Sequence, residues 1–297
     1  MTMKHTFKDW FLATRPWSFP ASAMPVMVTL FYLWWRGYEL SWGFGIWAVL
    51  NVVVFHACGN TWSDYFDYKK GVDADDTYGN KTLTDGLFTS GQIRALALGL
   101  LVVGAVFGVT LIYLTGWPLL FIGLGGLVCT LLYPFFKYRA LGDVVIFMAY
   151  AFLPTIGTSY VAVGVIDWGV WVVGLPVGLI TVSILHSNNL RDMQTDARAE
   201  ISTFAALVGP KSSVVIYVLE VLLPFVSVAV SVALGWLPVA ALLSLVALVP
   251  AWKACRVMLS YKSVGSDAIA NLDQVSAQLQ LVFSLLFSVG LVLGVLI

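Results

Sequence analysis

The chain has 297 residues, of which 60% are hydrophobic and 11% are charged, and its formal net charge at pH 7 is zero. So few charges exclude an ordinary soluble domain, and a chain without a basic excess gives no reason to expect a nucleic-acid partner. In lipid, only helices and closed barrels pair every backbone group, and the alternation of polar and apolar residues that a barrel needs is absent. We therefore expect an all-α polytopic membrane protein.

Nine segments are long and apolar enough to cross a bilayer as helices, which takes about 20 residues each. In chain order they are 17–35, 43–66, 95–115, 117–135, 143–164, 168–189, 212–233, 236–257 and 276–297. We expect these nine helices to form one domain over residues 1–297.

The lysines and arginines predict the orientation of the bundle. With a cytoplasmic N-terminus, 15 of the 16 cations, starting at Lys4, fall on the cytoplasmic side, and only Arg36 falls on the other side. Cytoplasmic segments of membrane proteins carry such an excess of lysine and arginine. An odd number of spans then puts the C-terminus on the far side. We expect a multi-pass protein of the inner (cytoplasmic) cell membrane.

Two acidic clusters end the second and sixth apolar segments. Each begins with an asparagine four residues before an aspartate; the members are Asn60, Asp64 and Asp67, and Asn188, Asp192 and Asp196. Residues with these spacings share one face of a helix, and both segments run toward the cytoplasm. Four carboxylates facing one another need cations, and oxygen-only ligands suit Mg²⁺ shared with a diphosphate. The clusters therefore predict an enzyme that handles a diphosphate in the membrane.

The distance between the clusters also suggests an internal duplication. The first residue of the second cluster follows that of the first by 128 residues. We expect two four-helix halves, about 1–165 and 166–260, in a parallel repeat, with the ninth helix added.

Three other readings of the acidic residues are open. They could merely cap helices and solvate loops, although matched spacing at one membrane face makes this the weaker interpretation. An ion-coupled transporter would place its acids near the bilayer midplane, in broken helices. A CDP-alcohol phosphotransferase would also depend on Mg²⁺, but its D-G-x-x-A-R start does not surround either cluster.

Other residues near the helix ends are candidates for substrate binding. Cations that could hold a diphosphate are Arg15, Lys81, Lys137, Arg139 and Arg191. Aromatic rings that could shield a carbocation are Tyr133, Tyr150 and Tyr160. His56 and His186 each precede a cluster, but without a metal-binding motif such as H-E-x-x-H we expect packed, hydrogen-bonded histidines.

Several segments resemble the UbiA superfamily of intramembrane aromatic prenyltransferases, over nearly the whole chain. The residues that carry the likeness are 13–16 (Ala-Thr-Arg-Pro), 20–22 (Pro-Ala-Ser), 64–73 (Asp-Tyr-Phe-Asp-Tyr-Lys-Lys-Gly-Val-Asp), 141–144 (Leu-Gly-Asp-Val), 157–160 (Gly-Thr-Ser-Tyr) and 188–196 (Asn-Asn-Leu-Arg-Asp-Met-Gln-Thr-Asp). The last segment is most similar to the second acidic motif of the 1,4-dihydroxy-2-naphthoate prenyltransferases of menaquinone synthesis.

The resemblance implies a UbiA-like bundle and a Mg²⁺-dependent transfer of a polyprenyl group from polyprenyl diphosphate to an aromatic acceptor. It implies that the metal ligands are Asp64, Asp67, Asp73, Asp192 and Asp196. It also implies that four of them, Asp64, Asp67, Asp192 and Asp196, are catalytic. The implied substrate-binding residues are Arg15, Asn60, Tyr133, Lys137, Arg139, Tyr160, Asn188, Asn189 and Arg191. For a naphthoate acceptor, loss of the carboxylate accompanies prenylation.

The sequence leaves the acceptor, the prenyl chain length and the oligomeric state open. Other branches of the superfamily use 4-hydroxybenzoate, another quinone precursor, haem or a lipid glycerol phosphate as the acceptor. Three features depart from the family pattern. Ser63 stands where the family usually has asparagine, Glu200-Ile201 replaces a usual Gly-Lys pair, and the 74–90 loop lacks the usual Gly-Pro and Arg pattern.

Overall fold

A computed structural model describes residues 5–74, 77–78 and 80–297, so Lys4 lies outside the described residues. In chain order its elements are α1 (Phe7–Ala13), η1 (Pro16–Ser18), α2 (Pro20–Trp35), α3 (Trp42–Lys70), α4 (Ser90–Thr115), α5 (Pro118–Lys137), α6 (Gly142–Phe147), η2 (Met148–Phe152), α7 (Leu153–Val163), η3 (Trp168–Val170), α8 (Trp171–Arg191), α9 (Met193–Arg198), α10 (Phe204–Val208), α11 (Pro210–Ala233), η4 (Val239–Ala247), α12 (Leu248–Val264), η5 (Ser266–Ile269) and α13 (Leu272–Leu296).

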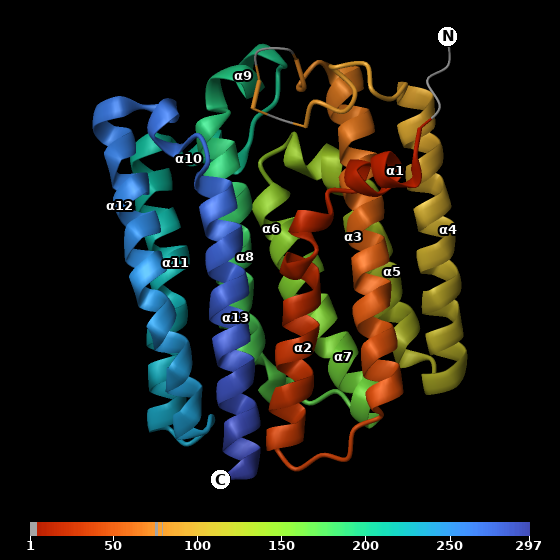
Figure 1. The fold of residues 1–297 in the computed structure, drawn as a ribbon, viewed down its shortest axis with the longest axis vertical. Coiled ribbons are helices and arrows are strands. Elements are labelled where there is room, and N and C mark those ends of the chain that lie inside the picture. The colour runs from red at the N-terminus through yellow and green to blue at the C-terminus, as the bar shows by residue number, and fades with distance from the viewer. Residues whose placement is uncertain (1–4, 75–76, 79) are drawn as a thin grey trace.

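The long helices run side by side as one bundle (Figure 1). Within the described residues, eight helical segments are long and apolar enough to cross a membrane. They correspond to the second through ninth predicted spans, which confirms the all-α membrane fold. The first predicted span is α2, whose 16 residues extend about 24 Å against a hydrocarbon core of about 30 Å.

Both acidic clusters belong to the same end of the bundle. The short helices α1, α9 and α10 and the connection between α3 and α4 gather there, whereas the C-terminus lies at the opposite end (Figure 1). We name this the motif end. It is the end that the lysine and arginine bias predicts to be cytoplasmic.

Helices at the motif end extend past the apolar segments. α3 continues to Lys70 and ends at Gly71, whose φ of 77° lies in the left-handed region that glycine adopts without strain. α4 begins at Ser90 with a capping box, in which the Thr89 hydroxyl accepts from the Gln92 backbone and Gln92 Oε1 accepts from Thr89 N at 2.9 Å. Capping lets the hydrogen-bonded helix continue into polar sequence.

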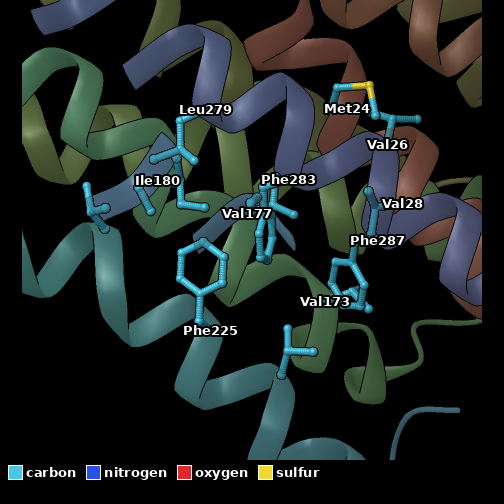
Figure 2. Packing of buried hydrophobic residues seen from close by; sticks show 14 of the residues in the cluster. Met24, Val26, Val28, Val173, Val177, Ile180, Phe225, Leu279, Phe283 and Phe287 are labelled. Carbon is cyan, nitrogen blue, oxygen red and sulfur yellow. The ribbon is translucent and has the colours of Figure 1, made fainter. Parts of the chain in front are cut away.

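The main core lies where α2, α8, α11 and α13 meet. Phe225, Phe283 and Phe287 are buried, and the Phe225 and Phe283 rings meet edge to face with centroids 5.3 Å apart. Val177 and Ile180 of α8 face these rings (Figure 2). The predicted ninth helix, α13, is therefore a central helix, and it holds α8, which carries the second acidic cluster, against α2 and α11.

The outer surface of α4 carries an apolar stripe. α4 turns Val102, Val106, Val109 and Tyr113 outward, where all four are exposed. A soluble protein rarely exposes so long an apolar stripe, whereas lipid solvates it. The stripe supports the membrane assignment independently of the core.

Glu200 has a strained backbone conformation. Its φ is 56°, in the left-handed region that disfavours residues with a Cβ, and its side chain is exposed. This explains why glycine suits the position. We expect Glu200→Gly to raise the free energy of unfolding by about 1 kcal/mol, measured as thermal melting in detergent. Glu200→Ala keeps the Cβ and is the control; an equal gain from alanine would contradict the strain.

Candidate active site

The first acidic cluster lies over the last turns of α3. Asp64 is buried, and its carboxylate forms an ion pair with Arg15 and accepts a hydrogen bond from Asn80 Nδ2 at 2.6 Å. The amide of Asn60 donates to the carbonyl oxygen of Thr14 at 3.0 Å. The cluster is therefore tied both to the segment before α2 and to the connection that follows α3.

Asp67 accepts three hydrogen bonds from side chains. Lys137 Nζ lies 3.0 Å from its Oδ2, and Ser63 Oγ donates to the same oxygen at 3.1 Å. The hydroxyl of Tyr138 donates to Oδ1 at 2.8 Å. Lys137 and Tyr138 come from the motif end of α5, so this contact joins α3 to α5. Ser63, which departs from the family pattern, serves here as a donor that orients the carboxylate.

The second acidic cluster spans a break between two helices. α8 ends at Arg191 and α9 begins at Met193, so Asp192 is the junction and the expected single helix is not continuous. The backbone bonds from Asp192 N to Asn188 O and from Asp196 N to Asp192 O, both 2.8 Å, keep the helical spacing. The break interrupts the helix between α8 and α9, but Asn188, Asp192 and Asp196 keep their helical spacing.

Arg191 holds the second cluster in place. Its Nε and Nη2 donate to the two oxygens of Asp192 at 2.8 and 2.7 Å, a bidentate geometry that fixes the carboxylate. Its Nη1 lies 3.4 Å from the carboxylate of Asp273 and donates to the Ala270 carbonyl oxygen at 3.1 Å. Arg191 thus joins α8 to the start of α13.

A cavity of about 460 Å³ brings the two clusters together. Its polar lining includes the predicted residues Arg15, Asn60, Asp67, Asp73, Tyr133, Lys137, Asn188, Asn189, Arg191, Asp192 and Asp196. Toward the opposite end of the bundle the lining is apolar and includes Leu111, Leu119, Ile122, Leu153 and Val161. The cavity therefore has a charged mouth and an apolar interior within one space.

The charges at the mouth fit divalent cations. Burial raises the pKa of Asp196 to about 7; Lys137 opposes this rise, and the carboxylates of Asp192 and Asp67 add to it. Burial, followed by the neighbouring Asp67, raises the pKa of Asp73 to about 6. Burial thus disfavours the ionised form of both carboxyls, and a bound divalent cation would favour it.

An unsatisfied oxygen supports the same conclusion. The side-chain oxygen of Asn188 is buried and has no hydrogen-bond partner among the residues that the structure describes. Amide and carboxylate oxygens are the ligands that Mg²⁺ prefers. Asp67, Asp73, Asn188, Asp192 and Asp196 form an oxygen-only donor set of that kind at the mouth.

Three of the predicted site residues are not on the cavity wall. Asp64 lies behind Arg15 and Asn80, which cover it. Arg139 is exposed beyond the end of α5, where its backbone forms an isolated bridge with Ser202. Tyr160 belongs to the far end of α7, and its hydroxyl donates to the carbonyl oxygen of Thr115 at 2.8 Å. Arg139 and Tyr160 are therefore left out of the site.

Other residues reach the cavity without having been predicted. Asp273 and Gln274 come from the start of α13, about 80 residues after the second cluster, in a stretch with no clustered motif. Asn80 lines the mouth from the connection between α3 and α4. A lone polar residue gives no periodic signal, so sequence spacing could not identify these three. His56 also lines the cavity, and it is packed and hydrogen-bonded as expected, with the Ser18 and Ser22 hydroxyls at 3.2 and 3.0 Å.

A sequence model of the UbiA prenyltransferase family matches residues 22–272, most of the chain and both acidic clusters. The chain belongs to the UbiA prenyltransferase family. It is 30% identical to the UbiA prenyltransferase domain-containing protein 1 of Mus musculus, covering 98% of this chain and 86% of the mouse protein. Across relatives of that name, the matched region spans 63% to 86% of their length.

Solved structures share the fold. The apo structure of a UbiA homolog from Aeropyrum pernix K1 has a TM-score of 0.64 at 17% identity and covers 94% of this chain and 96% of its own. A UbiA homolog from Archaeoglobus fulgidus bound to GPP and Mg²⁺ has a TM-score of 0.56 at 12% identity. The match covers 94% of this chain and 99% of the homolog's chain. These structures show the shared fold; the family match over residues 22–272 confirms the superfamily and the prenyltransferase class predicted from the motifs.

Proposed function

We propose that this UbiA prenyltransferase transfers a polyprenyl group from its diphosphate to an aromatic acceptor, with Mg²⁺ held by the two acidic clusters. The observation that carries the proposal is the cavity, which joins a mouth of carboxylates and cations to an apolar interior. A prenyl diphosphate has the same division into a charged head and an apolar tail. The Archaeoglobus fulgidus homolog, named as bound to GPP and Mg²⁺, supports this ligand class.

The residues at the mouth would have two roles, binding Mg²⁺ and binding the diphosphate. Asp67, Asp73, Asp192 and Asp196, with Asn188, would hold Mg²⁺, which neutralises the diphosphate and helps it leave. Lys137, Arg15 and Arg191 line the same space and would bind the remaining phosphate oxygens. The diphosphate departs with the electron pair of the carbon–oxygen bond, and an electron-rich ring forms the new carbon–carbon bond.

Aromatic side chains lie where an allylic cation would form. Tyr133 and Tyr150 line the cavity wall beyond the charged mouth. Tyr150 lies within the π-helical turn η2, where an extra residue per turn alters the direction of the side chains. Their rings would stabilise positive charge by cation–π contact and exclude water from it.

For the acceptor, we propose 1,4-dihydroxy-2-naphthoate, in menaquinone synthesis at the cytoplasmic membrane. The support is the likeness of residues 188–196 to the second acidic motif of naphthoate prenyltransferases. Attack by the ring carbon that bears the carboxylate would release carbon dioxide and leave a prenylated naphthoquinol.

The test is prenyl transfer by the purified protein in lipid, with a polyprenyl diphosphate and each acceptor in turn, with Mg²⁺ and with EDTA. We expect Mg²⁺-dependent formation of the prenylated naphthoquinol, demethylmenaquinol, from the naphthoate. Product only from 4-hydroxybenzoate or a lipid glycerol phosphate would overturn the acceptor and keep the reaction class. No product from any acceptor would overturn the proposed function.

The apolar interior also predicts a preference for chain length. Gly126 lines the cavity, and a Cβ added there would meet no atom of the described residues within 4 Å. We expect Gly126→Phe to raise KM for long prenyl diphosphates by about tenfold and to leave a short donor unaffected. Gly99→Phe is the control, because Gly99 has equal space but does not line the cavity. Equal effects on long and short donors would contradict a tail at Gly126.

A further inference from the structure

A second cluster of ionisable residues lies outside the cavity lining. Asp143 of α6, His186 of α8 and Glu220 of α11 are all buried, and one ligand atom from each lies within 4.8 Å of the others. His186 Nδ1 is 3.2 Å from Glu220 Oε1 and 3.4 Å from Asp143 Oδ2. The three side chains converge from three different helices.

Hydrogen bonding does not account for this arrangement. Both carboxylates face the same ring nitrogen, Nδ1, which carries at most one proton and can direct it at one oxygen. Charge-assisted hydrogen bonds are usually about 2.7–2.9 Å long, shorter than either contact. Meanwhile Asp143 Oδ2 and Glu220 Oε2 are buried, and neither has a hydrogen-bond partner among the described residues. A single Nδ1–H therefore leaves acceptor oxygens of both acids unsatisfied.

The charge of the cluster is also unbalanced. With both acids ionised, the cluster carries two negative charges beside a neutral imidazole, and protonation of His186 still leaves one, so neutrality without a metal would take a second proton on an acid. Burying an uncompensated charge in a low-dielectric interior is costly, so such a charge is paired or binds a metal. One divalent cation beside a neutral His186 brings the cluster to zero.

The distances fit a metal. Ligand atoms at about 2.1 Å from one ion are about 3.0–3.4 Å apart in octahedral or tetrahedral geometry. The two contacts of His186 Nδ1 fall within that range. The other oxygen of Asp143 accepts from Asn189 Nδ2 at 3.0 Å, the kind of outer hydrogen bond that orients a carboxylate ligand.

We propose that Asp143, His186 and Glu220 bind one divalent transition-metal ion, for which Zn²⁺ is the best fit. A site with one imidazole and two carboxylates suits zinc, whereas the oxygen-only clusters at the mouth suit Mg²⁺. His186 precedes Asp192 by six residues, about 9 Å along the helix, so the sites are separate. The ion joins α6, α8 and α11 and, through Asp143, fixes Asn189 on the cavity wall.

The test is metal analysis of the full-length protein in detergent, stripped with EDTA and then titrated with Zn²⁺. We expect one tightly bound zinc per chain and a rise in melting temperature on binding. Glu220→Gln, which is nearly isosteric, and His186→Gln should each weaken zinc binding at least about tenfold and remove the thermal shift. Asp192→Asn, which alters the proposed Mg²⁺ site, should retain the zinc.

A spectroscopic measurement on the unmodified chain covers the case in which a variant does not fold. Co²⁺ bound in place of zinc should show visible d–d absorption, and its X-ray absorption should fit one nitrogen and at least two oxygens. No stoichiometric zinc in the unmodified protein, a Co²⁺ site without nitrogen, or unchanged binding in folded Glu220→Gln would overturn the site. Because prenyl transfer is measured separately, such a result leaves the proposed function standing.

Discussion

Asp192→Asn is expected to lower the rate of prenyl transfer by at least about 100-fold, with the protein still folded. The substitution keeps the shape of the side chain but removes the charge that Arg191 clamps and that faces the cavity. Loss of a residue that merely supports a metal ligand costs about 10–100-fold, so loss of a ligand should cost no less. The measurement is turnover in lipid across a Mg²⁺ titration, with melting temperature as the check on folding.

Glu39→Gln is the matched control for Asp192→Asn. Glu39 is an exposed carboxylate in the connection between α2 and α3, at the end of the bundle remote from the clusters. We expect it to keep normal activity. If folded Asp192→Asn retained near-normal turnover at low Mg²⁺, the metal assignment of the second cluster would be wrong.

Lys137→Gln is expected to lower kcat by about 100–1,000-fold. Lys137 is bonded to Asp67 at 3.0 Å and lines the cavity, where it also lies in the field of Asp196. A fixed donor aimed at charge that develops in the transition state has an effect of this size when it is removed. Single-turnover measurements with saturating donor would separate this loss from weaker donor binding.

Arg139→Gln provides the control two residues away. Arg139 is exposed and does not line the cavity, so its substitution should change kcat by less than about twofold. A loss from Arg139→Gln equal to that from Lys137→Gln would mean that general positive charge at this end, and not the position of Lys137, supports the reaction.

The existence of the helices could be predicted from the sequence because bilayer thickness sets their length. Their ends could not. The predicted second span stops at residue 66, before Asp67, Lys69 and Lys70, but α3 continues to Lys70 because its hydrogen bonds run on to the cap at Gly71. Likewise α4 starts at Ser90, five residues before the predicted span, behind the capping box of Thr89. Hydropathy indicates which residues lie in lipid, whereas capping determines where the hydrogen bonds of a helix end.

The acidic clusters could be predicted because helical spacing puts their members on one face. The choice among nearby cations could not. Lys137 and Arg139 are equivalent in the sequence, but α5 ends at Lys137, so only Lys137 is directed at Asp67. Asp64 belongs to the cluster by spacing, but the approach of Arg15 from before α2 covers it.

The sequence by itself determined that this protein lies in a lipid bilayer, that it is helical and that it has two acidic clusters. Hydropathy and helical period are local properties and can be recognised in short segments. Only the tertiary structure placed Asp273 beside Arg191, and Asp143 and Glu220 beside His186. Those pairs are separated by 82, 43 and 34 residues, and no local pattern links them. They meet because α13, α6 and α11 pack against α8, and packing between distant segments is decided by shape and burial over the whole bundle.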